Sequence, residues 1–324
     1  MNTLERIENI GIVPVVKISK ASDALPLAFA LYKGGIDCAE ITFRSDYALE
    51  AIKTINKALP DMLLGAGTIR NVAQAKEAID AGASFIVTPG FNHEVVKWCI
   101  EHNVLVMPGI SSATELETAL SYGLTNVKFF PAQSSGGAQK IKDLSGPYPQ
   151  IKFMPTGGIN AENMHEYLSL PSVIAIGGSF MLPQASIDDG DFETIELLSK
   201  QAVKSLLNYE LIHLGINSEN EVEGKKTAEL LCFLFDFKFY QKPKSQFAGR
   251  GFEILNTNGR GTNGHFALYT PYPQKALYQL KKKGINPIES SITRNKKTNQ
   301  INFVYLDIEI SGFGVHLINP DVKM

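Results

Sequence analysis

The chain has 324 residues, of which 44% are hydrophobic and 20% are charged, and its formal net charge is −2 at pH 7. This composition is typical of a globular protein with enough residues for one large domain or two ordinary ones. We expect no nucleic-acid partner and no membrane attachment, because the chain has no basic excess, no apolar run of membrane-spanning length and no signal-peptide core at its start.

Cysteines and charge indicate the compartment and the domain organisation. Cys38, Cys99 and Cys232 are far apart and lack metal-binding spacing, which predicts reduced thiols in a cytoplasmic protein. Residues 209–324 carry 15 Lys and Arg against 11 Asp and Glu, a net of +4, and residues 1–208 carry 16 against 22, a net of −6. This shift predicts two domains, 1–208 and 209–324.

Short apolar runs recur about every 20 residues between residues 13 and 179. They predict strands over 13–18, 38–43, 62–68, 85–90, 104–110, 127–131, 152–159 and 173–179. Helical patterns lie between them, as at 21–33, 47–58, 72–81 and 113–122, and the expected helix caps are Ser22, Ser45, Asn71, Asn92 and Ser112. Eight β-α units with nearly continuous apolar strands predict an α/β fold, most simply a (β/α)8 TIM barrel. A doubly wound open sheet is the alternative.

Lys128 is the charged residue in the apolar run 127–131. Burial beside Phe129 and Phe130 would desolvate its ammonium and favour the neutral amine, which is the form that makes a Schiff base with a carbonyl substrate. The alternative is a lysine at a strand end whose amine reaches solvent. Taken alone, the run favours that alternative, but the residues at the other strand ends reverse the preference.

Glu40 and Arg44 stand at the C-terminal end of a predicted strand, on the face that carries catalysis in a barrel. Strand alternation sends Glu40, Thr42 and Arg44 to one side. A buried carboxyl at Glu40 could give and take protons, and the guanidinium of Arg44 could hold a substrate carboxylate. The alternative is an ion pair of Glu40 with Arg44 or Lys128 that serves structure alone.

Two glycine pairs follow the last two predicted strands, where barrels commonly bind phosphate through bare backbone N–H groups. They are Gly157-Gly158 and Gly177-Gly178, and each has a hydroxyl neighbour, Thr156 or Ser179. Together they predict a phosphate site.

These motifs resemble those of the 2-keto-3-deoxy-6-phosphogluconate (KDPG) and 4-hydroxy-2-oxoglutarate (KHG) aldolases over about residues 1–208. The matching segments are Glu40-Ile-Thr-Phe-Arg44, Gly65-Ala-Gly-Thr68, Thr88-Pro-Gly90, Pro108-Gly-Ile-Ser111, Lys128-Phe-Phe-Pro-Ala132, Pro155-Thr-Gly-Gly-Ile159 and Gly177-Gly-Ser179. The resemblance implies a class I aldolase without a metal or other cofactor, usually a homotrimer. Gln133 is a departure, because many relatives carry an acidic residue there.

The resemblance also implies roles for single residues. Lys128 would form the imine, and Glu40 would shuttle protons. Substrate would be held by Arg44 and Thr68 at its carboxylate, by Pro89, Phe130 and Thr156 along the pocket, and by Gly157, Gly158, Gly177, Gly178 and Ser179 at its phosphate. The implied reaction cleaves KDPG to pyruvate and glyceraldehyde 3-phosphate, with KHG, which yields pyruvate and glyoxylate, as a second substrate. The alternative is a non-catalytic keto-acid or sugar-acid binding protein with a degenerate barrel.

Residues 209–324 show a different pattern, which predicts a smaller α+β domain. Strands are expected at 210–216, 265–270, 301–309 and 314–318, helices at 224–235 and 272–283, and short strands up to 255. This is a βαβββ unit that occurs twice, with a repeat of roughly 52 residues. The openings His213-Leu-Gly-Ile-Asn217 and His265-Phe-Ala-Leu-Tyr269 resemble vicinal-oxygen-chelate (glyoxalase-like) modules.

That second resemblance implies metal ligands on the first and last strands of each unit. The matching residues are His213, Glu253, His265 and His316, and three imidazoles with a carboxylate suit a divalent transition metal. His316 departs from the family, which usually has an acid at this position. The alternatives are a degenerate module with structural histidines and a domain that only mediates assembly.

Overall fold

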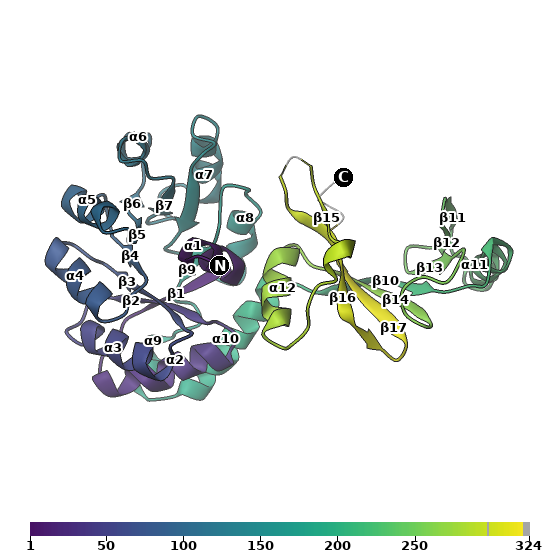
Figure 1. Ribbon diagram of the computed structural model, residues 1–324, viewed down its shortest axis with the longest axis horizontal. Helices are drawn as coiled ribbons and strands as arrows, with labels where there is room; N and C mark the ends of the chain where they lie inside the picture. The colour runs from purple at the N-terminus through teal and green to yellow at the C-terminus, as the bar shows by residue number, and fades with distance from the viewer. Residues whose placement is uncertain (297, 320–324) are drawn as a thin grey trace. The chain divides into compact units, whose positions relative to one another are not determined.

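The computed structural model describes residues 1–296 and 298–319. The chain divides into two compact units, Met1–Leu206 and Leu207–Met324 (Figure 1). No helix in the described part of the chain is both long and apolar enough to cross a membrane.

The first unit alternates short parallel strands with helices. Its strands are β1 (Ile12–Val16), β2 (Cys38–Thr42), β3 (Leu63–Gly67), β4 (Phe85–Val87), β5 (Leu105–Met107), β6 (Gly109–Ile110), β7 (Asn126–Phe129), β8 (Lys152–Pro155) and β9 (Ile176–Gly178). Six of them pair in the order β5-β4-β3-β2-β1-β9, and three in the order β6-β7-β8. A single parallel bridge between Thr156 and Gly177 joins the end of β8 to β9. A strand lies within each of the eight predicted ranges or overlaps it, and the fifth is split in two.

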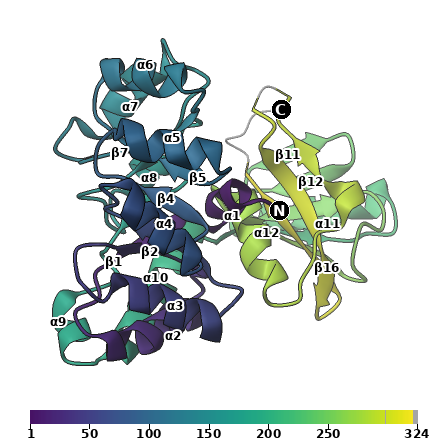
Figure 2. The same cartoon turned by 60° about the vertical axis from the view of Figure 1, so that its left-hand side comes forward.

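Helices lie outside these strands (Figures 1 and 2). They are α1 (Thr3–Ile10), α2 (Ala24–Lys33), α3 (Ala48–Ala58), α4 (Val72–Asp80), α5 (His93–Glu101), α6 (Ala113–Ser121), α7 (Gly137–Ser145), α8 (Met164–Leu168), α9 (Gln184–Asp188) and α10 (Phe192–Leu207), with a 3-10 turn at Ala21–Asp23. Each buries an apolar stripe, as α3 does with Ala51, Ile52 and Ile55. The pattern of the sequence therefore places one helix layer against the parallel strands.

Three of the five predicted helix caps are confirmed. The side chains of Asn71, Asn92 and Ser112 each accept a hydrogen bond from the backbone N–H three residues later. The predictions for Ser22 and Ser45 are wrong. The hydroxyl of Ser22 donates to Asp23 instead, and Ser45 lies three residues before the start of α3, where only its carbonyl accepts a hydrogen bond.

The second unit consists of two successive βαβββ segments. The first contains β10 (Glu210–Ile216), α11 (Glu221–Phe235), β11 (Phe239–Lys242), β12 (Ser245–Ala248) and β13 (Phe252–Leu255). The second contains β14 (Gly264–Tyr269), α12 (Pro273–Lys281), a 3-10 turn at Glu289–Ser291, β15 (Thr293–Arg294), β16 (Ile301–Ile310) and β17 (Phe313–Ile318). All eight strands form one sheet in the order β11-β12-β13-β10-β14-β17-β16-β15, joined by the antiparallel pair β10–β14.

The two faces of this sheet differ in what covers them. α11 lies on one face, where a Cβ on its Gly224 would be 3.1 Å from Oε1 of Gln246 on β12. Successive residues of a strand point to opposite faces, so Phe247 points away from α11. Glu253 pairs with Phe247 in register and shares its face. That second face is where the predicted metal ligands gather.

Candidate active site and candidate metal centre

Lys128 and Glu40 form a buried pair in the first unit. Lys128 lies on β7 and Glu40 on β2, and Nζ of the lysine is 3.1 Å from Oε1 and 3.4 Å from Oε2 of the glutamate. Glu40 is 1% exposed and Lys128 is 6% exposed. The ring centroid of Phe130 lies 5.5 Å from the same nitrogen. The amine therefore points into the protein, beside the carboxyl group with which it was expected to act.

Gly67 leaves the space that the Glu40 carboxylate occupies. A Cβ on Gly67, the last residue of β3, would lie 2.1 Å from Oε1 of Glu40. Two residues earlier, a Cβ on Gly65 would lie 2.2 Å from the ring of Phe85. Both glycines belong to the motif Gly65-Ala-Gly-Thr68, and no role was predicted for Gly67. The available signal was a glycine inside a buried strand, which marks a close approach by another group.

The pair has the geometry for proton transfer. A carboxylate at hydrogen-bond distance can take a proton from an ammonium and leave a neutral amine whose lone pair attacks a carbonyl carbon. The same carboxyl group can return the proton to a departing hydroxyl. A buried ion pair is a weak source of stability, because desolvation offsets most of the attraction. Stability alone therefore does not account for the two charges.

Arg44 lies in the turn after β2 and is exposed. Its Nε donates to Oγ1 of Thr42 over 3.2 Å, and that hydroxyl donates to the carbonyl of Val16 on β1 over 2.7 Å. Arg44 also lines a cavity of about 440 Å³ with Arg70. Neither Lys128 nor Glu40 lines this cavity. The guanidinium is thus anchored to two strands at the end where the sheet carries its polar residues.

The other predicted pocket residues follow the C-terminal ends of parallel strands. Thr68 comes directly after β3 with a φ of 60°, and Pro89 is exposed shortly after β4. Phe130 comes directly after β7 and is 37% exposed. Thr156 comes directly after β8 and is buried. Because all four strands are parallel, these residues lie along one edge of the sheets.

The predicted phosphate-binding residues lie in a turn after β8 and at the end of the neighbouring strand β9. Gly157 and Gly158 follow β8 with φ values of 102° and 75°, which strongly favour glycine. Gly177 lies on β9 against Thr156, since a Cβ there would be 2.2 Å from Oγ1 of the threonine. Gly178 is buried at the end of β9, and Ser179 after it is exposed.

Gln133 and Tyr167 support the first of these turns. The backbone N–H of Gln133 donates to the carbonyl of Gly157 over 3.0 Å, and a Cβ on Gly158 would lie 2.6 Å from Cβ of Gln133. The hydroxyl of Tyr167 donates to Oε1 of Gln133 over 2.5 Å. Tyr167 is fully buried, and burial raises the pKa of its phenol. Sequence analysis missed Tyr167, because nothing local links it to a residue 34 positions earlier.

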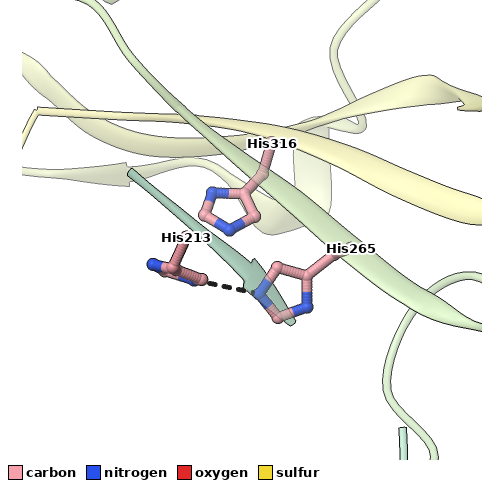
Figure 3. A group of neighbouring side chains, drawn as sticks. All are labelled: His213, His265 and His316. Carbon is pink, nitrogen blue, oxygen red and sulfur yellow. Dashed lines mark hydrogen bonds between the residues drawn. The ribbon is translucent and has the colours of Figure 1, made fainter. Parts of the chain in front are cut away.

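The second unit brings three histidines together on one face of its sheet (Figure 3). His213, His265 and His316 come from β10, β14 and β17, and one ligand atom of each lies within 4.8 Å of the others. Nε2 of His213 is 3.1 Å from Nε2 of His265. Oε2 of Glu253 lies 3.0 Å from Nε2 of His213 and 3.4 Å from Nε2 of His265. The three histidines therefore meet, and Glu253 contacts two of them.

Strand register explains this convergence. Gly215 on β10 pairs with both Glu253 and His265, so these two side chains flank a residue without one. A Cβ on Gly215 would lie 2.1 Å from Cε1 of His265. In the next row, Ala267 pairs with both His213 and His316. A small residue thus separates the larger groups in each row and leaves room for their rings.

The charge state of the cluster follows from burial and hydrogen bonds. Burial alone would raise the pKa of Glu253, but hydrogen bonds from His213, His265 and Ser245 outweigh it and hold that pKa well below its usual range. Ser245 donates to Oε1 of Glu253 over 2.6 Å. Burial, together with the neighbouring His265 and His213, lowers the pKa of His316 to about 3. His316 is therefore neutral near pH 7, which is the form that binds metals.

The donor set fits a divalent transition metal. Imidazole nitrogens suit zinc, copper, iron and nickel, and a carboxylate completes a mixed set. Nδ1 of His265 and Nδ1 of His316 are buried without a hydrogen-bond partner among the described residues. In His265 the nitrogen that faces His213 and Glu253 is Nε2, which is therefore the ligand atom that this ring offers.

Comparisons with known proteins concern the first unit. A family model described as KDPG and KHG aldolase matches residues 4–198. A 2-dehydro-3-deoxy-phosphogluconate aldolase of Treponema pallidum is 48% identical over 200 residues, which are 62% of this chain and 95% of that protein. The KHG/KDPG aldolase of Escherichia coli is 40% identical over 193 residues, 60% of this chain and 91% of that one. A crystal structure of KDPG aldolase from Legionella pneumophila, with pyruvate captured as a covalent carbinolamine, has a TM-score of 0.60 and 37% identity and covers 62% of this chain and 98% of that chain.

Proposed function

Because this chain belongs to the KDPG and KHG aldolase family and is a lyase, we propose that its first unit cleaves KDPG to pyruvate and glyceraldehyde 3-phosphate through an imine on Lys128. The observation that carries the proposal is the buried Lys128 amine 3.1 Å from the Glu40 carboxylate. KHG, which would yield pyruvate and glyoxylate, is the second substrate that we propose.

The proposed steps balance with these two residues. Glu40 takes a proton from Lys128, and the freed amine attacks C2 of the keto acid to give a carbinolamine. Glu40 returns a proton to the leaving hydroxyl, and water departs to leave a protonated imine. Glu40, again a carboxylate, takes the proton of the C4 hydroxyl as the C3–C4 bond breaks, which releases the aldehyde and leaves an enamine to which Glu40 can return that proton at C3. Protonation at C3 and addition of water then release pyruvate and restore the amine.

Substrate contacts are proposed from position and chemistry. Arg44 and Thr68 would hold the keto-acid carboxylate, because a guanidinium fork matches two carboxylate oxygens. Backbone N–H groups near Gly157, Gly158, Gly177, Gly178 and Ser179 would hold the distal phosphate. Pro89, Phe130 and Thr156 would shape the space between the two ends.

We also infer that the two parallel sheets are parts of one (β/α)8 barrel. Lys128 N–H donates to the carbonyl of Pro108, the residue between β5 and β6, so the fifth strand continues across its break. The bridge from Thr156 to Gly177 supports closure on the other side. A homotrimer and a cytoplasmic location stay predictions.

Reduction with borohydride in the presence of pyruvate tests the imine. We expect a mass increase on the peptide that contains Lys128 and none in Lys128→Ala. Lys152→Ala is a matched control, because Lys152 also lies on a strand of the first unit but its Nζ donates to the Pro171 carbonyl. Absence of an adduct on Lys128 would overturn the proposal. An adduct without KDPG cleavage would support the alternative, a keto-acid binding protein with a degenerate site.

For the second unit we propose a divalent transition metal held by His213, Glu253, His265 and His316, in paired modules of the vicinal-oxygen-chelate kind. Such a metal would supply Lewis-acid chemistry at the centre of the sheet. Metal analysis of the full chain tests this. We expect about one metal per chain, and clear losses in His213→Ala and His265→Ala. Absence of bound metal after loading with zinc, cobalt, manganese, nickel or iron would favour a role in assembly.

A further inference from the structure

Arg260 lies over an aromatic ring at one end of the histidine cluster. It belongs to the segment between β13 and β14, and its guanidinium carbon is 5.2 Å from the ring centroid of Tyr305. Tyr305 packs edge-on against His265 and His316, with ring centroids 6.3 Å and 5.1 Å apart. A single ring thus separates this cation from two of the proposed metal ligands.

Lys242 has the same relation to the other end of the cluster. It is the last residue of β11, and its Nζ lies 4.3 Å from the ring centroid of Phe247. Phe247 packs edge-on against His213, with ring centroids 5.8 Å apart. Lys242 belongs to the first βαβββ segment and Arg260 to the connection between the two segments. The rings that they cover stand on β12 and β16, on opposite sides of the strands that carry the cluster.

Strand register places both rings on the face that carries the cluster. Phe247 pairs with Glu253, and Tyr305 pairs with His316, so each ring continues a row that contains a proposed ligand. Arg260 itself packs on that face. A Cβ on Gly314, which pairs with His265, would lie 3.3 Å from the carbonyl oxygen and 3.4 Å from Cγ of Arg260.

Two cations, Arg260 and Lys242, lie over rings that flank the cluster, and strand register places the acids Glu253 and Glu309 on the same face. Among residues 1–296 and 298–319, neither Arg260 nor Lys242 forms an ion pair with a carboxylate. Glu253 is the acid within the cluster, and its oxygens are engaged by His213, His265 and Ser245. A divalent metal would add two positive charges beside these cations. An anion is the ligand that such a surface attracts.

We infer that this face of the second unit binds a small metabolite that carries an oxyanion, either a carboxylate or a phosphate, with Arg260 as its principal partner. The inference rests on the metal proposed for the cluster. Arg260 is placed first because it lies beside Gly314, the register partner of His265, and over the ring of Tyr305. A guanidinium fork can bind two oxygens of one oxyanion. Lys242 supplies attraction from the other side as a point charge.

Cobalt(II) absorption offers a test on the full chain that does not depend on any enzymatic activity. The metal-free protein is loaded with cobalt, and its visible spectrum is followed during titration with oxalate, inorganic phosphate or imidazole. Oxalate has no ketone, so it cannot form an imine on Lys128. Imidazole is a neutral metal ligand and serves as the control for the cation requirement.

We expect oxalate, phosphate or both to shift the spectrum, with an affinity that falls as salt is added. Arg260→Gln should weaken the effective anion by roughly 3- to 10-fold, and Lys242→Gln by less, because both side chains are exposed. Imidazole should bind both variants as it binds the wild type. Arg250→Gln is the matched control, because Arg250 lies in the turn between β12 and β13 and should leave anion binding unchanged.

The outcomes separate the two proposals. A response to oxalate alone identifies a carboxylate ligand, a response to phosphate alone identifies a phosphate ester, and either supports the inference. Cobalt binding with no response to either anion, or with equal anion affinity in Arg260→Gln and the wild type, overturns the inference and leaves the metal proposal intact. Failure of cobalt to bind overturns both.

Discussion

Replacing Gly67 with alanine tests how the first unit positions its proton-transfer group. A Cβ on Gly67 would lie 2.1 Å from Oε1 and 2.6 Å from Cγ of Glu40. Ordinary van der Waals contact begins near 3.4 Å, so the carboxylate must retreat by about 1.3 Å or the strands must separate. Glu40 is 1% exposed and has little room to move. We therefore expect the substitution to disturb its 3.1 Å hydrogen bond to Lys128 first.

Both activity and stability should fall. Proton transfer by a positioned side chain contributes about 10²- to 10⁴-fold to a rate, so we expect kcat for KDPG cleavage to drop about 100-fold or more. Overpacking a core costs about 1–3 kcal/mol, and a buried charge that loses its partner costs about 3–5 kcal/mol. Because the glutamate keeps part of its contact with Lys128, we expect the free energy of unfolding to fall by about 2–4 kcal/mol.

Pyruvate release coupled to lactate dehydrogenase and NADH measures kcat, and urea unfolding measures stability. Gly65→Ala is the matched control, because Gly65 lies on the same strand as Gly67 and the atoms nearest to its Cβ would be those of the Phe85 ring on β4, at 2.2 Å. We expect this control to lose stability to a similar extent but to keep most of its kcat once folded. Wild-type kcat in Gly67→Ala, or an equal loss of kcat in Gly65→Ala, would refute the reasoning.

Three further predictions concern Glu40, Ser245 and His316. Glu40→Gln keeps the side chain's size but cannot take a proton, so kcat should drop about 100-fold or more while borohydride still traps pyruvate on Lys128; normal turnover would contradict this. Ser245→Ala removes the hydrogen bond that orients Glu253, so metal binding should weaken about 10- to 100-fold, measured by competition with a chelator. Unchanged metal affinity would contradict this role of Ser245. The pKa of His316 is lowered from 6.5 to about 3, so between these values the unfolded chain binds a proton that the folded chain does not. Stability of the metal-free second unit should therefore fall as pH falls through this window, and an unchanged pH slope of the urea midpoint in His316→Phe would count against it.

Local sequence signals were sufficient for most elements, because each depends on neighbours along the chain. The strand predicted at 210–216 is found as β10, Glu210–Ile216. Asn71, Asn92 and Ser112 cap helices because each precedes a helical pattern and its side chain reaches a backbone N–H three residues later. Ser22 shows the limit of this logic. Its hydroxyl finds Asp23 first, and a 3-10 turn comes before the helix.

Contacts across strands depend on register and on shape, which no local pattern specifies. Gly67 is separated from Glu40 by a helix and two loops, and the reason for its small size is visible only when β2 and β3 pair. Tyr167 likewise reaches Gln133 from α8, a helix further along the chain. Arg260 and Lys242 were not predicted, because each stands outside the strands that carry the ligands. Residues whose role depends on such contacts can be identified only from the folded structure.

The histidine cluster shows how one repeated local motif produces a long-range site. Each segment begins with a histidine followed two residues later by a small residue, His213 with Gly215 and His265 with Ala267. Because β10 and β14 pair antiparallel, each histidine lies opposite the small residue of the other strand. A slip of one residue would turn one histidine toward the face that carries α11. Each copy of the motif supplies one histidine and one small residue, and the antiparallel pairing relates the two copies by a local two-fold. This arrangement is sufficient to bring two imidazoles into contact at the centre of the sheet. It also leaves space there for the ligands from β13 and β17.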